Sequence, residues 1–88
     1  MKPASPLAFR LRKTWAGPKP EWIVTHPAGY GVASFGEREY DLARWEAEYR
    51  EAQAVEFCRV LGITPAEFIA LASARFDAFL VTMTGDVP

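Results

Sequence analysis

Glycine and proline are distributed unevenly along this chain, and their distribution limits what it can fold into. They recur throughout residues 16–36, whereas residues 38–61 contain neither. Because glycine and proline interrupt regular structure and favour turns, the first region is restricted to short elements. The second region is rich in alanine, glutamate and arginine, which are good helix formers. We therefore predict short strands before Gly36 and one long helix after it.

Three short strands are expected before Gly36. Residues 7–13 alternate apolar and basic side chains, which is the period of a strand, and residues 21–26 are β-branched and aromatic. Residues 30–35 continue the same pattern after a Pro-Ala-Gly break. The connections are too short for the crossovers that parallel strands need, so the pattern predicts an antiparallel meander.

Two helices are expected to follow. In the first helix, we expect one apolar face to pack on the sheet. This face is made of Leu42, Trp45, Tyr49, Ala52 and Val60, with Phe57 at its edge. Glu56 falls among these positions and is expected to reach solvent. Gly62 ends the helix, and the sequence Thr64-Pro65-Ala66-Glu67 predicts a capping box at the start of the second. That helix should run to about residue 82 or 83, with an apolar core face made of Phe68, Ile69, Ala72, Phe76, Phe79 and Met83.

This order of elements indicates the α+β class: a three-stranded antiparallel sheet (meander) followed by two helices packed on one face. A chain of 88 residues supplies one core, so we expect a single compact domain over residues 7–84. Residues 1–6 are expected to form a flexible lead, and residues 85–88 a tail.

The charge and the single cysteine favour a cytoplasmic protein without a general attraction to polyanions. The net charge is −1, and Cys58 has no second cysteine with which to form an internal disulfide. The N-terminus carries no apolar signal segment, and no apolar run approaches the roughly 20 residues that span a bilayer. If the chain is encoded by a phage, the expected compartment is the host cell cytoplasm.

No catalytic, metal-binding or cofactor-binding residues are predicted. His26 lies at a strand end, and Cys58 is interpreted as a small buried hydrophobe, although the sequence leaves a Cys58–His26 pair open. The acids at residues 37, 39 and 41 would serve a metal, but acids are also favoured at a helix N-terminus. We therefore expect no enzymatic activity.

Three surfaces remain as candidates for partner binding. The first is a basic segment on and after the first strand, where an aromatic side chain accompanies cations that would suit a phosphate backbone. The second is a charged face of the first helix, and the third is a stripe of alanines on the second helix that allows close helix approach. The residues are, in order, Arg10, Arg12, Lys13, Trp15 and Lys19; Arg44, Glu48 and Glu51; and Ala70, Ala74 and Ala78. We expect the three basic strand residues, Arg10, Arg12 and Lys13, to lie on one side of the strand.

The main functional hypothesis is a small non-enzymatic protein-binding module that blocks a partner's surface sterically. By size and architecture alone, such a chain is comparable to the inhibitors carried by phages and mobile elements, for which anti-CRISPR proteins are the example. The alternative is a nucleic-acid-binding adaptor that uses the basic strand, with a helix pair that weakly resembles a helix-turn-helix over residues 54–71. A homodimer through the alanine stripe is a further alternative, and no membrane partner is expected.

Overall fold

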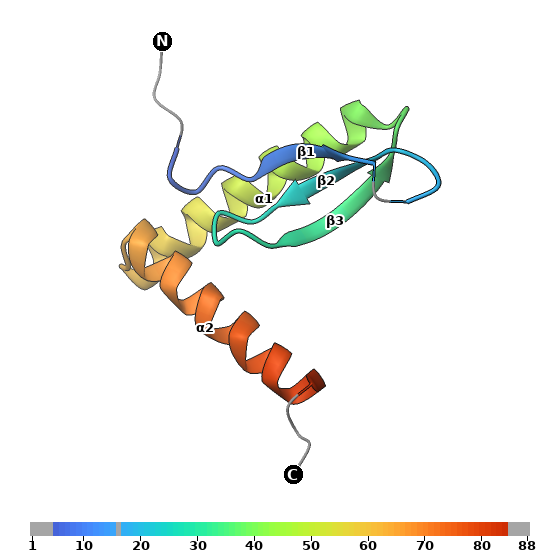
Figure 1. Cartoon of the computed structure of the whole chain (residues 1–88). Helices are drawn as coiled ribbons and strands as arrows, with labels where there is room; N and C mark the ends of the chain where they lie inside the picture. The colour runs from blue at the N-terminus through green and yellow to red at the C-terminus, as the bar shows by residue number, and fades with distance from the viewer. Residues whose placement is uncertain (1–4, 16, 85–88) are drawn as a thin grey trace.

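The chain folds into a three-stranded antiparallel sheet followed by two helices, as seen in a computed structural model that describes residues 5–15 and 17–84, with side chains described through residue 78. The elements are β1 (Arg10–Thr14), β2 (Glu21–Thr25), β3 (Gly31–Gly36), α1 (Tyr40–Leu61) and α2 (Pro65–Thr84) (Figure 1). The predicted α+β class and the meander are confirmed. Residues 1–4 of the expected lead, the expected tail at 85–88, and the side chains of Phe79 and Met83 lie outside the described part.

The sheet has β2 at its centre, and α1 lies along one of its faces (Figure 1). β1 pairs with β2 from Arg10↔Thr25 to Thr14↔Glu21, and the β2–β3 register shifts between Val24 and Thr25. Val24 is fully buried against Ala43 and Ala47 of α1. Half-buried side chains complete this core: Phe9, Leu11, Trp22, Val32, Ala33 and Phe35. A second cluster of Leu7, Ala54 and Cys58 continues the core toward α2.

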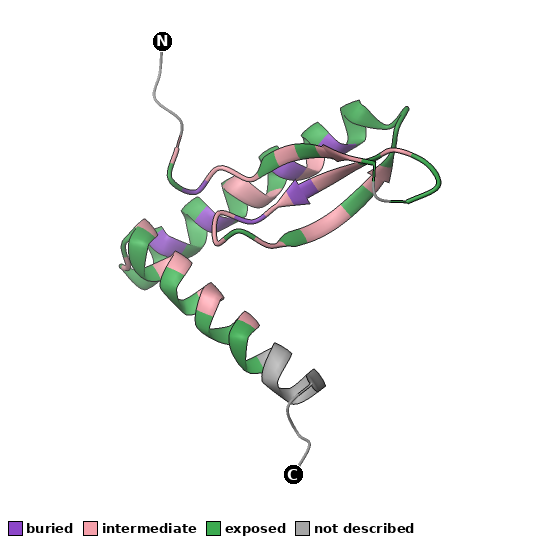
Figure 2. Ribbon diagram, viewed as in Figure 1, coloured by how far each residue is buried: buried purple, intermediate pink, exposed green. Residues whose placement is uncertain are grey.

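The face of α1 that lies on the sheet is not the one predicted. The buried residues of α1 are Ala43, Ala47, Ala54 and Cys58. Ala43 and Ala47 pack on the sheet core around Val24, and Ala54 and Cys58 pack on Leu7. In Figure 2 these buried positions appear as purple segments within an otherwise mostly exposed helix. The predicted core face is exposed instead: Leu42, Trp45, Tyr49, Ala52 and Val60. The sheet supplies the large side chains of this interface, and close packing then requires small residues on the helix. The expected burial of Cys58 and exposure of Glu56 are both confirmed.

The connection between the helices follows the local signals closely. Gly62 adopts the left-handed conformation (φ 66°) that favours glycine, and the Ile63 N–H donates to the Cys58 carbonyl at 3.1 Å. In the capping box, the Thr64 N–H donates to Glu67 Oε1 at 2.8 Å and the Glu67 N–H donates to Thr64 Oγ1 at 3.1 Å. These hydrogen bonds confirm the predicted start of α2.

The chain turns by 107° between α1 and α2, and α2 extends away from the sheet (Figure 1). Its predicted core face is only half-buried at Phe68, Ile69, Ala72 and Phe76, and no α2 side chain is fully buried up to residue 78 (Figure 2). Within the described residues, no single helix is long and apolar enough to cross a membrane. Only the bent pair of α1 and α2, taken together, meets the length and composition that a membrane span requires.

Candidate functional site

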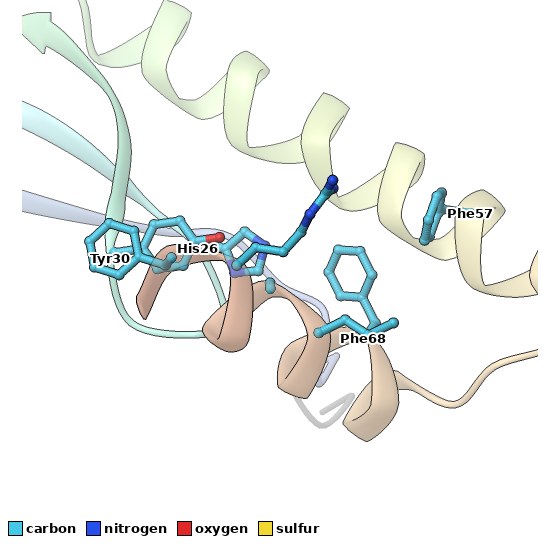
Figure 3. Close-up of a pocket in the computed structure, with 8 residues that line it drawn as sticks. His26, Tyr30, Phe57 and Phe68 are labelled. Atoms are coloured by element: carbon cyan, nitrogen blue, oxygen red, sulfur yellow. The ribbon is translucent and has the colours of Figure 1, made fainter. Parts of the chain in front are cut away.

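An apolar cleft of about 600 Å³ lies where α2 meets the end of α1 and the β2–β3 turn. Figure 3 shows His26 and Tyr30 of the turn on one side of it, with Phe68 of α2 and Phe57 of α1 on the other. Among the residues whose side chains are described, the lining is His26, Tyr30, Phe57, Phe68, Leu71, Ala72, Arg75 and Phe76. Its size and its mostly aromatic walls are typical of sites that bind apolar groups.

A stack of aromatic rings forms the wall of this cleft. The Tyr30 ring lies 4.4 Å from that of Phe76 and 4.7 Å from that of His26, within 10° of parallel in both cases. His26 also stacks on Phe68 with ring centroids 5.5 Å apart. Such pairs contribute about 0.5–1.5 kcal/mol beyond the area they bury. The stack therefore joins α2 to the β2–β3 turn.

His26 is held in the neutral form by its surroundings. It is buried, and the Ala28 N–H donates to its Nδ1 at 2.9 Å, so that nitrogen acts as an acceptor and the proton resides on Nε2. Burial lowers the pKa of His26, and the positive charge of Arg50 lowers it further. A neutral imidazole between Tyr30 and Phe68 behaves as part of the aromatic wall, which agrees with the structural role expected at this strand end.

Local sequence positions the cleft residues from both sides. The turn closes through the His26 N–H, which donates to the Tyr30 carbonyl, and the Gly29 N–H, which donates to the His26 carbonyl, both at 2.8 Å. Gly29 has φ 104°, a conformation that other residues rarely adopt. On the opposite side, the capping box places Phe68 in the first turn of α2. Arg75 lies at the cleft and forms no ion pair with any described residue.

The predicted basic segment is divided between two surfaces. Arg10 and Arg12 are exposed on the sheet face opposite α1, but the assignment of Lys13 to their side was wrong. Neighbouring strand residues alternate sides, so Lys13 points the other way. There it forms an ion pair with Glu37 at 3.3 Å and lies 4.7 Å from the ring centre of Trp15. Lys19 is exposed in the following turn.

The contacts next to Lys13 attach the start of α1 to the sheet. Trp22 Nε1 donates to the Glu37 carbonyl at 3.1 Å, and the Trp22 ring meets Tyr40 edge-on at 4.9 Å. Glu39 accepts a hydrogen bond from the Gly36 N–H at 2.7 Å. Glu37 and Glu39 therefore have structural partners, and no group of three or more His, Cys, Asp or Glu able to hold a metal occurs among the described residues.

The other two predicted surfaces lie on the helices. Arg44 and Glu48 form an exposed ion pair at 3.4 Å, whereas Glu51 is half-buried and does not join them. Exposed pairs of this kind contribute little to stability. The alanine stripe of α2 is exposed as expected, at Ala70, Ala74 and Ala78.

The α1–α2 pair has one geometric property of a helix-turn-helix. Its 107° angle and three-residue connection with Gly62 lie within the range of that motif. The exposed side of α2, however, presents mainly alanine, Glu67 and Asp77, and Arg75 is its one basic side chain among the described residues. Reading base edges needs several donors on the recognition helix, so the chemistry of α2 does not suit that task.

Sequence reasoning did not identify the cleft as a site. The helical pattern predicts Phe68, Ala72 and Phe76 as core residues, and it indicates no role for Tyr30 or Leu71. The sequence signal that could have indicated it is the density of large apolar residues on α2, where Phe68, Ile69, Leu71 and Phe76 fall within nine residues. No family model, curated protein or solved structure matches this chain significantly.

Proposed function

We propose that this chain is a non-enzymatic protein-binding module whose cleft receives apolar side chains of a protein partner. The observation that carries the proposal is the open aromatic cleft of about 600 Å³ beside α2. Leu71 at its rim is 54% exposed, so part of the apolar lining remains in water in the isolated chain.

The composition of the cleft favours a protein as the ligand. Aromatic residues and arginine are the residue types most enriched in protein interfaces and in their energetic hot spots. Arg75 supplies a cation next to an apolar surface, which suits an acidic residue adjacent to an apolar one on the partner. The exposed alanine stripe of α2 lies on the same helix and would let a partner helix approach closely.

The mode of action we propose is steric. An arm such as α2, which extends from a small body, covers part of the surface it binds without any chemical step. Inhibition of the partner follows if that surface is the partner's working site, as in the small inhibitors of phages and mobile elements. We place this activity in the cytoplasm, or in the host cytoplasm for a phage-encoded chain, because a chain with one cysteine forms no internal disulfide, which suits a reducing compartment.

The test is a photo-crosslinking amino acid placed at position 71 or at position 61, in cells that naturally contain the chain. Leu71 and Leu61 are 54% and 55% exposed, but only Leu71 lines the cleft. We expect a protein adduct from position 71 and none from position 61, with Leu71→Asp abolishing recovery of that protein and Leu61→Asp preserving it. Equal adducts from both positions, or adducts to nucleic acid alone, would contradict the proposal.

A second candidate is nucleic-acid binding through Arg10 and Arg12. Its support is that both arginines project from the open sheet face, with Trp15 68% exposed beyond the end of β1. Lys13 adds no cation to that surface, because it lies on the opposite side of β1, paired with Glu37. This candidate requires an affinity that falls steeply with salt and is lost in the Arg10→Glu, Arg12→Glu double variant.

A further inference from the structure

His26 lies where three parts of the chain meet in the aromatic wall of the cleft. Its imidazole stacks on Tyr30 of the β2–β3 turn and on Phe68 of α2, with ring centroids 4.7 Å and 5.5 Å apart (Figure 3). Phe9, in the segment before β1, meets it edge-on at 5.0 Å. A change in the charge of this one ring therefore acts on the contacts of all three parts.

Only the neutral imidazole matches the hydrogen bond that His26 makes. Its Nδ1 accepts from the Ala28 N–H at 2.9 Å, whereas a protonated ring carries hydrogen on both nitrogens and accepts nothing. Protonation would therefore set two donors against each other within the turn. It would also leave a charge in a buried position, where the loss of hydration is unfavourable.

The charges around His26 also oppose a further cation. His26 lines the cleft and two neighbouring hollows, one against the segment before β1 and one against α1. The cleft contains Arg75, the second hollow Arg10 and the third Arg50, and no aspartate or glutamate among the described residues lines any of them. Glu46, on the turn of α1 before Arg50, is joined to it by an ion pair at 2.6 Å. Burial and, after it, the charge of Arg50 lower the pKa of His26.

α2 is attached to the rest of the chain largely through this wall. No α2 side chain is fully buried up to residue 78, and Phe68 and Phe76 stack on His26 and Tyr30. The core around Val24, between the sheet and α1, contains no described residue of α2. An element with few buried contacts opens at a lower free energy than the core does, so α2 can leave while the sheet and α1 remain folded.

We propose that protonation of His26 releases α2 from the β2–β3 turn and takes the cleft apart, while the sheet and α1 stay folded. The released form binds one more proton, so its population relative to the closed form rises by up to about tenfold per pH unit below about pH 6.5, until the pH reaches the folded pKa. The consequence for binding rests on the proposed function: a partner held in the cleft binds the neutral form, and its affinity falls with falling pH.

The first test follows the chain alone by NMR from about pH 7.5 to about pH 5. We expect the contacts between the Tyr30 and Phe76 rings and the amide protection of α2 to weaken as His26 titrates, with β2 still protected. Loss of protection in α2 and β2 together, or a ring contact that is unchanged after His26 has titrated, would overturn the proposal. So would a His26 pKa above its ordinary value, which attraction of the imidazolium to its two stacked rings would produce.

The second test compares two arginines of α1 that each form an ion pair one helical turn away. Arg50 pairs with Glu46 and Arg44 with Glu48, but only Arg50 lines a hollow with His26. Arg50→Gln should raise the pKa of His26 and reduce the release of α2 at about pH 5, whereas Arg44→Gln should change neither. Equal effects of the two variants would overturn the electrostatic argument.

A third measurement separates this proposal from the proposed function. The photo-crosslinked adduct from position 71, formed in lysate, should decline from about pH 7.5 to about pH 5, and Arg50→Gln should retain more of it than Arg44→Gln. An adduct that persists although NMR shows α2 released would overturn the regulation of the cleft. Absence of an adduct at every pH, with the NMR results as expected, would count against the proposed function alone.

Discussion

We predict that stacking of Tyr30 on Phe76 attaches the middle of α2 to the β2–β3 turn. The rings are 4.4 Å apart and within 4° of parallel. Replacing either by leucine keeps much of the apolar volume but removes the stacking. Because Phe76 is only half-buried, we expect each single change to lower the free energy of unfolding by about 1–2 kcal/mol, less than a Phe→Ala change in a core. In the double variant the two losses should fall short of additive by about 1 kcal/mol.

The assay is urea unfolding followed by circular dichroism for the four proteins of the cycle, together with hydrogen exchange of the α2 amides. Exchange in α2 should rise in the single variants more than exchange in β2, since the helix loses its attachment before the sheet opens. Phe57 provides the control, because it contacts Phe68 edge-on at 5.9 Å and has no ring contact with Tyr30. Leucine changes at Tyr30 and Phe57 should therefore add within about 0.5 kcal/mol. Additivity at Tyr30 and Phe76 as well would refute the role assigned to the stack.

Three further measurements test the fold. Thr64→Ala should cost about 1 kcal/mol of unfolding free energy in urea titrations, since the Glu67 N–H loses its acceptor; an unchanged midpoint would contradict the capping box. Burial lowers the pKa of His26 in the folded chain. Below about pH 6.5 the imidazole therefore binds a proton in the unfolded chain but not in the folded chain, and the free energy of unfolding should decrease with falling pH until the folded pKa is passed. NMR titration of His26 measures the folded pKa directly, and the pH dependence of stability should flatten in His26→Asn. A folded His26 pKa at its ordinary value would contradict this prediction. Val24→Ala should cost about 2 kcal/mol by thermal or urea unfolding, because Val24 is fully buried between sheet and α1, and a cost near zero would show that this core is misplaced.

Signals that act over a few residues were sufficient to predict the elements. The alternation in residues 7–13 and the break at Pro27-Ala28-Gly29 predicted strands that the structure places at Arg10–Thr14 and Glu21–Thr25. Gly62 and the Thr64–Glu67 capping box predicted the end of one helix and the start of the next within a residue or two. The helix signals work because the hydrogen bonds of the C-cap and the capping box join residues three to five positions apart.

The orientation of α1 was not predictable by the same means. A helical pattern shows which residues share a face, but not which face a neighbouring sheet will accept. Here the sheet supplies Leu11, Trp22 and Phe35 to the interface, so the helix contributes its alanines and turns Trp45 and Tyr49 outward. Packing volume between two elements decides this, and neither element contains that information alone.

Sequence by itself determined the α+β class, the meander, the helix boundaries and the exposure of Ala70, Ala74 and Ala78, because local propensity and turn chemistry act over a few residues. The tertiary structure alone decided the rest. It placed Lys13 on the other side of β1 from Arg10 and Arg12, and it left Trp45 and Tyr49 of α1 exposed. It also assembled a cleft from the β2–β3 turn and the two helices. These features depend on contacts between residues distant in the chain, whose geometry follows from how large and small side chains fill the space between elements.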